Sequence, residues 1–100
     1  MGISISHGVP STRSAATITN LGQHLAHTLN GSEWREIMNL FECRLDMPLA
    51  IPPAQAGRIG SLLAKAAGHR AMDQEWGQLA DLLAGAAQRA AAAGQDWEWT

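Results

Sequence analysis

Two neighbouring residues near the start of the chain, Ser6 and His7, are of the types that nucleophilic catalysis uses. A serine nucleophile needs a histidine within hydrogen-bonding reach to take its proton. The alternating sequence around them predicts a strand, and adjacent strand residues point to opposite faces of a sheet. The chain also contains no GxSxG, phosphate-loop or GxGxxG motif. We therefore expect no catalytic residues, and we predict that the chain is not an enzyme.

A pair of histidines, His24 and His27, has the i, i+3 spacing that brings two side chains to nearby faces of a helix. Together with His7 or Cys43 they would make a metal site. Zinc motifs, however, pair ligands at both ends, and the sequence contains neither CxxC nor HExxH. We expect His24 and His27 to lie on the polar side of a helix, with no metal and no cofactor.

The single cysteine, Cys43, lies near the expected end of the second helix. The negative end of a helix dipole disfavours the thiolate that a nucleophile needs, so we expect a packed, inert thiol. One cysteine cannot form an intrachain disulfide, which fits a reducing cytoplasm as the expected location.

Acidic and basic residues are segregated along the chain. Residues 47–72 contain Arg58, Lys65 and Arg70 and no acid, whereas residues 73–100 contain several acids and only Arg89 as a base. Two interpretations stay open: attraction between helices within the fold, or an acidic face that meets a basic partner surface. On the second interpretation, the partner-binding residues are Glu33, Glu36, Asp73, Glu75, Asp96, Glu98 and Trp99.

Four tryptophans are many for a chain of this length. Trp34 and Trp76 lie on the apolar stripes of expected helices, which predicts that they belong to the core. Trp97 and Trp99 share one face of an expected terminal strand, where they would cover the helices. The alternative leaves one of them partly exposed as an interface anchor, and this is why Trp99 is in the partner-binding set.

The 100 residues are enough for one compact domain, residues 1–100, and the abundance of Ala and Leu favours helix. We predict an α+β fold, with about four helices packed on a small antiparallel sheet formed by the N- and C-terminal strands. The first helix is expected at about 14–29. The second is expected to begin at a cap at Ser32 and to stop at 46–48. The third and fourth are expected at 53–67 and at 74–93. Residues 49–51 are either a short strand or an extended link.

The same patterns predict how the helices begin and end. Ser14, Ser32 and Asp73 are expected N-caps, because their side-chain oxygens accept hydrogen bonds from backbone N–H groups of the first turn. The C-terminal ends are expected at 30–31, where Asn and Gly tolerate left-handed backbone, and at Gly68 and Gly94. The glycines at 57 and 60 suggest a close approach of another backbone.

Several classes of function are excluded by composition. No apolar run approaches the ~20 residues of a membrane span, and the N-terminus lacks the layout of a signal peptide. The net charge is −2, and three basic side chains without interleaved aromatics give no footprint for nucleic acid. We expect a cytoplasmic protein that binds neither membrane nor nucleic acid directly.

Three segments carry a resemblance: ISHG at 5–8, IPPAQA at 51–56 and WEW at 97–99. In this order and spacing, the chain resembles end to end a family of small uncharacterised actinobacterial proteins. In size and build it is also similar to phage-encoded anti-CRISPR inhibitors, a functional class of unrelated folds with no shared motif. That similarity implies a protein that blocks a Cas surface by binding to it.

We therefore expect a non-enzymatic protein-binding module, most concretely a mobile-element accessory or inhibitor protein of anti-CRISPR type that blocks a partner surface stoichiometrically. The expected partner is a protein, with the basic surface of a nucleoprotein complex as one form of it. The alternative is a small regulatory protein that acts as a homodimer, and a small hydrolase-like enzyme comes third. Capture of the partner separates the first two, and a closed pocket lined by convergent polar groups would indicate the enzyme.

Overall fold

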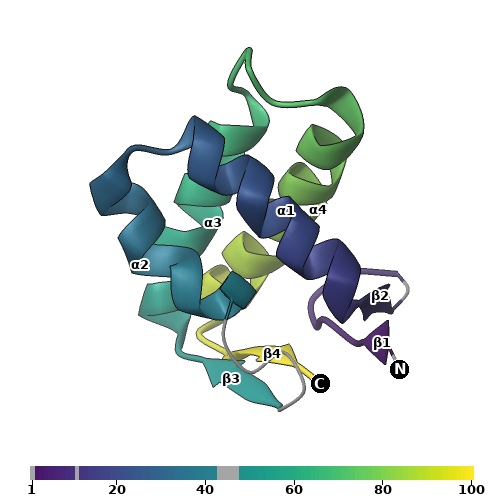
Figure 1. Cartoon of the computed structure of the whole chain (residues 1–100). Coiled ribbons are helices and arrows are strands. Elements are labelled where there is room, and N and C mark those ends of the chain that lie inside the picture. The colour runs from purple at the N-terminus through teal and green to yellow at the C-terminus, as the bar shows by residue number, and fades with distance from the viewer. Residues whose placement is uncertain (1, 11, 43–47) are drawn as a thin grey trace.

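The computed structural model describes residues 2–10, 12–42 and 48–100, and in them the chain forms helices and short strands (Figure 1). The predicted α+β class with about four helices is confirmed, but in place of the one sheet that we expected from the terminal strands, the described residues form two small antiparallel sheets. The helices are α1 (Ala15–Thr28), α2 (Gly31–Glu42), α3 (Pro53–Ala67) and α4 (Gln74–Ala93). The strands are β1 (Gly2–Ile3), β2 (Arg13–Ser14), β3 (Leu49–Ile51) and β4 (Trp97–Trp99).

Two predictions concern residues outside the described ranges. The inert thiol of Cys43 and most of the predicted stop at 46–48 lie outside the described residues. Within the described residues, no helix combines the length and the apolar character that crossing a membrane requires.

The predicted caps of α1 and α4 are confirmed. The Ser14 hydroxyl accepts a hydrogen bond from the backbone N–H of Thr17, and the Asp73 carboxylate accepts one from that of Glu75. Gly94 ends α4 with a φ of 67°, the left-handed conformation expected of a terminating glycine. The ends of the longest helix are thus encoded by local sequence.

The predicted junction between α1 and α2 is wrong. We expected a left-handed turn at residues 30–31 followed by a cap at Ser32, but Leu29 is extended with a φ of −94°, and Asn30 is the residue that caps α2. The side-chain oxygen of Asn30 accepts from the backbone N–H of Glu33 at 2.8 Å, and the Glu33 carboxylate accepts from that of Asn30 at 3.2 Å. This reciprocal capping box satisfies two backbone donors at once, which a cap at Ser32 would not.

Helices α3 and α4 lie side by side and make the closest helix pair of the fold (Figure 1). At Gly60, an added Cβ would lie only 3.2 Å from the carbonyl oxygen of Ala84 and from the Cβ of Ala87. At Gly57, it would lie 3.4 Å from the Cβ of Ala91, an ordinary contact. The predicted close approach of another backbone is therefore confirmed, and Gly60 is the residue that requires it.

Strand β4 lies between two other segments of chain. On one side it pairs antiparallel with β3, which settles residues 49–51 as a strand. On the other side Ile5 forms a bridge with Trp99, and the backbone N–H of Ser6 donates to the carbonyl of Glu98 at 2.9 Å. The predicted pairing of the two termini is therefore present at Ile5 and Ser6. Strand β3 pairs with the other edge of β4. Strand β1 itself pairs with β2.

The tryptophans of β4 are in the core. Trp97 is fully buried and Trp99 is 1% exposed, and their rings pack edge to face at 5.2 Å. The expectation of an exposed Trp99 anchor is therefore wrong, because β4 turns this indole toward Phe41. Trp34 and Trp76, which we expected in the core, are half-buried and pack against its edge.

Candidate protein-binding surface

Two of the predicted partner-binding acids, Glu33 and Glu36, form ion pairs within the fold. The Glu33 carboxylate lies 2.5 Å from Nζ of Lys65. Glu36 accepts two hydrogen bonds from the Arg58 guanidinium, at 2.9 and 2.8 Å, across the space between α2 and α3. Attraction between helices, the first of our two interpretations of the charge segregation, therefore describes these two acids.

The ion pairs also shift the titration of their carboxyl groups. The hydrogen bond from Lys65, followed by the backbone hydrogen bond from Asn30, lowers the pKa of Glu33 below its ordinary value. The hydrogen bonds from Arg58 lower the pKa of Glu36 and raise the pKa of Arg58 itself. Both carboxylates thus favour their charged form and are paired with bases of α3.

The other predicted acids divide between the two ends of α4. Asp73 and Glu75 lie at its start, and Asp96 and Glu98 follow its end, all of them exposed. A helix of this length is about 30 Å long. The structure therefore brings together two pairs of acids rather than the whole predicted set. Within the described residues, none of these acids takes part in an ion pair.

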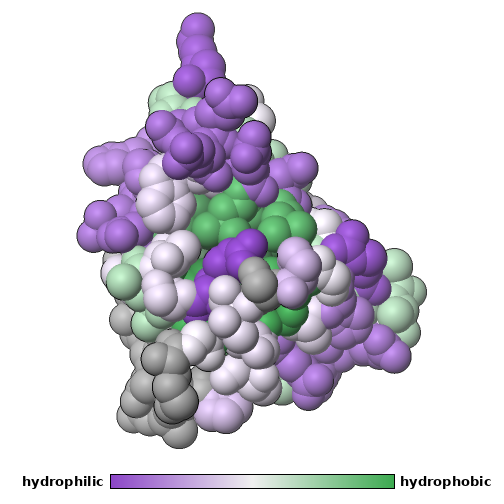
Figure 2. All heavy atoms as spheres, turned by 90° about the vertical axis from the view of Figure 1, so that its right-hand side faces the viewer, coloured by the Kyte–Doolittle hydropathy of each residue, from purple (hydrophilic) through white to green (hydrophobic). Residues whose placement is uncertain are grey.

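The outer side of α4 is hollowed on both sides of Leu82. One hollow of about 310 Å³ lies toward the N-terminal strands, and another of about 450 Å³ lies toward α3. Figure 2 shows the side of the molecule where β1, β2 and the start of α4 lie: hydrophobic atoms are visible in its middle, with hydrophilic atoms between and above them and atoms of intermediate hydropathy below. We call the surface around these two hollows the α4 surface; the residues that line it include Arg13, Glu75, Gln78, Leu79, Asp81, Leu82, Gly85 and Arg89.

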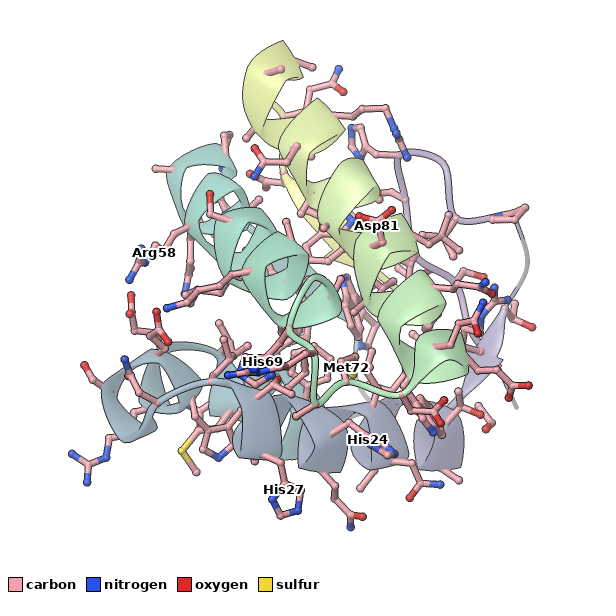
Figure 3. All side chains as sticks on the ribbon, turned by 90° about the horizontal axis from the view of Figure 1, so that it is seen from above. His24, His27, Arg58, His69, Met72 and Asp81 are labelled. Atoms are coloured by element: carbon pink, nitrogen blue, oxygen red, sulfur yellow. The ribbon has the colours of Figure 1, made fainter. Side chains whose placement is uncertain are left out.

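Of the residues of this surface, only Glu75 belongs to the predicted partner-binding set, and Asp81 is the acid that the set left out. It is exposed and lines the hollow that Leu82 and Gly85 share with α3. In Figure 3, Asp81 lies on α4, while Arg58 projects from the side of α3 that faces α2. The acid-rich composition of residues 73–100 was the available signal, but only the structure shows that Asp81 points outward beside an apolar hollow.

The two histidines of α1 have different surroundings. His24 is half-buried and stacks on the ring of Trp76, with centroids 4.9 Å apart and planes at 25°. His27 is exposed on the outer side of α1 (Figure 3). The expectation of two polar-face histidines therefore fits His27 and not His24. No group of three or more potential metal ligands is found in the part of the chain that the structure describes.

The argument that Ser6 and His7 cannot hydrogen-bond is wrong. The Ser6 hydroxyl lies 2.6 Å from Nδ1 of His7, and Nε2 of His7 lies 2.8 Å from the side-chain oxygen of Gln95. His7 has a φ of 67°, so it leaves the strand conformation on which the argument depended. We call this set of contacts the Ser6–His7–Gln95 network.

The arrangement resembles a nucleophile, a base and an orienting group, but its hydrogen-bonding capacity is used within the fold. The Ser6 hydroxyl also accepts from the backbone N–H of Glu98 at 2.9 Å, and the carbonyl of His7 accepts from Nε of Arg89 at 2.7 Å. The network thus joins the N-terminal segment to β4 and to the end of α4. We interpret it as a structural clasp.

Fold and surface together define a small α+β domain in which two hollows along α4 combine half-buried leucines with charged side chains. The model of the domain family of unknown function DUF7739 matches residues 7–100, so the chain belongs to this family. No curated protein and no solved structure matches the chain.

Proposed function

We propose that the protein is a non-enzymatic protein-binding module that acts through the α4 surface. The observation that carries the proposal is a pair of half-buried leucines, Leu79 and Leu82, with charged side chains around them. These are the exposed acids Glu75 and Asp81 and the bases Arg13 and Arg89. An apolar centre with a polar rim is the usual anatomy of a protein interface. The acids of α2 are paired with bases of α3 and are left out of this proposal.

The partner that fits this surface is a protein with a basic face, of the kind that otherwise contacts nucleic acid. The acids at the start of α4 attract such a face and accelerate its approach, while the leucines provide the apolar contact. In its most concrete form, the protein is a stoichiometric inhibitor of anti-CRISPR type. The resemblance to small actinobacterial proteins suggests an actinobacterium with a CRISPR system as the host in which to search.

Affinity capture followed by mass spectrometry identifies the partner, and the association rate of the purified pair then tests the surface. Glu75→Lys with Asp81→Lys should slow association about tenfold and flatten its dependence on salt, because rim charges act mainly on the encounter rate. Asp96→Lys with Glu98→Lys makes the same change of charge at the other end of α4 and serves as the matched control. Equal rates for the two double variants would contradict the proposed surface.

A further inference from the structure

The chain contains three asparagines, and Asn30 is the one that a glycine follows, whereas leucine follows both Asn20 and Asn39. An asparagine amide is among the thermally labile groups of proteins, because the backbone nitrogen of the next residue can attack its side-chain carbon. A glycine in the next position leaves that nitrogen unobstructed, since glycine has no Cβ. The sequence thus distinguishes Asn30 chemically from the other two asparagines.

The structure leaves both reacting groups accessible at the junction between α1 and α2 (Figure 1). Asn30 and Gly31 are exposed, and an added Cβ at Gly31 would meet nothing within 4 Å. Gly31 is the first residue of α2, so its N–H has no acceptor inside the helix. Within the described residues this N–H donates no other hydrogen bond. Its nitrogen is therefore available as a nucleophile once it loses its proton.

The start of α2 also polarises the side-chain amide of Asn30. The Oδ1 atom of Asn30 accepts a hydrogen bond from the backbone N–H of Glu33 at 2.8 Å. This donor lies at the positive end of the helix dipole, where negative charge is stabilised. Charge that develops on Oδ1 during an attack, and charge on the deprotonated nitrogen of Gly31, are both favoured by this position.

We propose that Asn30 is a site of spontaneous deamidation in the folded protein, and that its capping box with Glu33 sets the rate. The nitrogen of Gly31 forms a bond to Cγ of Asn30, and the bond between Cγ and the amide nitrogen breaks. Ammonia leaves and carries the proton that the Gly31 nitrogen gave up. The cyclic imide then takes up one water at either of its carbonyl groups and opens to aspartate or isoaspartate. Water is the only co-reactant, so the site needs no enzyme.

The capping box acts as a brake on this reaction. The Glu33 carboxylate accepts from the backbone N–H of Asn30 at 3.2 Å, and the same carboxylate is paired with Lys65 on α3. Closing the imide ring reshapes the side chain and backbone of Asn30, and this breaks the box. Molecules in which the start of α2 is frayed therefore react faster than molecules in which it is closed. Lys65 slows the reaction indirectly, because it holds Glu33 in place.

The two products change the junction in different ways. Aspartate keeps the length of the backbone and is itself a good N-cap. Isoaspartate adds a carbon atom to the backbone and shortens the side chain, so the box with Glu33 cannot form. Because Glu33 belongs both to the box and to the ion pair with Lys65, the isoaspartate form also loosens the contact between α2 and α3. The α4 surface has no part in this chemistry, so the inference is independent of the proposed function.

Peptide mapping by mass spectrometry, after incubation of the folded protein in warm, mildly alkaline buffer, tests the site. The tryptic peptide 14–35 carries both Asn20 and Asn30, so the two are compared in one spectrum. The mass change from amide to acid should accumulate at residue 30, as separate aspartate and isoaspartate peaks, while Asn20 keeps its amide. Gly31→Ala should abolish the conversion over the same period, because the new methyl group obstructs the nitrogen. Gly57→Ala makes the same substitution in α3 and should leave the conversion unchanged.

The rate of conversion at Asn30 tests the brake. Glu33→Ala should speed the conversion about fivefold, as expected when a helix start loses part of its cap. Lys65→Met keeps Glu33 without its partner on α3 and should speed the conversion less. Glu75→Ala removes an acid from the first turn of α4 instead, and as the matched control it should react like the unchanged protein.

Two results would overturn the inference, and circular dichroism of each variant shows that the fold is retained when they are read. If residue 30 keeps its amide as long as Asn20 does, Asn30 is not a deamidation site. If Glu33→Ala and Lys65→Met both react at the rate of the unchanged protein, the capping box does not set the rate. Neither result bears on the proposed function, because partner association is measured separately.

Discussion

The hydroxyl of Ser6 lies 2.6 Å from Nδ1 of His7, its neighbour in the chain. Two residues in regular strand conformation cannot make this contact, and the φ of 67° at His7 is what allows it. A left-handed backbone is costly for a residue with a side chain and persists only when its surroundings hold it. Those surroundings are the hydrogen bonds that join the His7 ring to Ser6 and Gln95, and the one that its carbonyl accepts from Arg89.

The first prediction concerns this clasp. His7→Ala should destabilise the protein by about 2 kcal/mol, because it removes two side-chain hydrogen bonds and keeps the backbone strain. His7→Gly loses the same hydrogen bonds but adopts a positive φ without strain, so it should cost about 1 kcal/mol less. Denaturant unfolding measures both values. A variant with Ala as stable as the unchanged protein would show that the network contributes nothing to stability.

The clasp also shows where sequence reasoning fails. The alternation of Ile3 and Ile5 with serines correctly predicts extended chain that pairs with the other terminus, because side-chain periodicity follows from backbone geometry. The change of direction at His7 depends on Gln95 and Arg89, more than 80 residues away. A tertiary hydrogen bond of this kind leaves no local pattern. The caps at Ser14, Asp73 and Gly94 are local, and they were predictable.

The second prediction concerns pH. Hydrogen bonds from Lys65 and Arg58 lower the pKa values of Glu33 and Glu36 in the folded protein. The stability that these pairs contribute is therefore fully present above the ordinary carboxyl pKa and is lost as the pH falls through the lowered folded values. Because the pairs are exposed, the loss should be small and should shrink with added salt. Melting temperatures across the acidic range measure it.

The control is the double variant Glu33→Gln with Glu36→Gln, which should lose less stability than the unchanged protein over the same fall in pH. Equal acid dependence in the two proteins would show that these pairs contribute no net stability. The sequence alone left two roles open for these acids, since a glutamate at a helix start is compatible with a solvated face or a neighbouring helix. Only the distance between α2 and α3 decides between them.

The third prediction compares the two tryptophans of β4. Nε1 of Trp97 donates to the carbonyl of Ser6 at 3.2 Å, whereas Nε1 of Trp99 is buried with no partner among the described residues. Trp97→Phe loses volume and a hydrogen bond, and it leaves a carbonyl without its donor. Trp99→Phe loses similar volume but removes an unsatisfied donor, so it should cost about 1–2 kcal/mol less. Chemical denaturation measures the loss of stability in each variant. Equal losses in the two variants would contradict the prediction.

The fourth prediction separates the histidines of α1. His24→Ala should destabilise the protein by about 1 kcal/mol, because the stacked contact with Trp76 is lost. His27→Ala should change stability by less than about 0.5 kcal/mol, because His27 is exposed and only surface is altered. Thermal unfolding distinguishes the two. Equal effects of the two variants would show that the stacking of His24 on Trp76, between α1 and α4, adds nothing to the stability of the protein.

The last prediction compares two glycines of α3 that the sequence does not distinguish. Gly→Ala inside a helix gains about 1 kcal/mol of helix propensity when the new methyl group has room. Gly57→Ala has room, because its Cβ would lie 3.4 Å from that of Ala91. Gly60→Ala does not, because its Cβ would lie 3.2 Å from the carbonyl oxygen of Ala84 and 2.9 Å from the side-chain amide of Gln88.

The Gln88 amide can move, but the carbonyl of Ala84 is fixed by its own helix. The added methyl group at residue 60 must therefore push α3 and α4 apart along their closest contact. We expect Gly57→Ala to stabilise the protein by up to about 1 kcal/mol and Gly60→Ala to destabilise it by about 1–3 kcal/mol, the usual cost of overpacking. Denaturant midpoints measure the two shifts, which should have opposite signs. Stabilisation by Gly60→Ala would mean that α3 and α4 are farther apart than the structure places them.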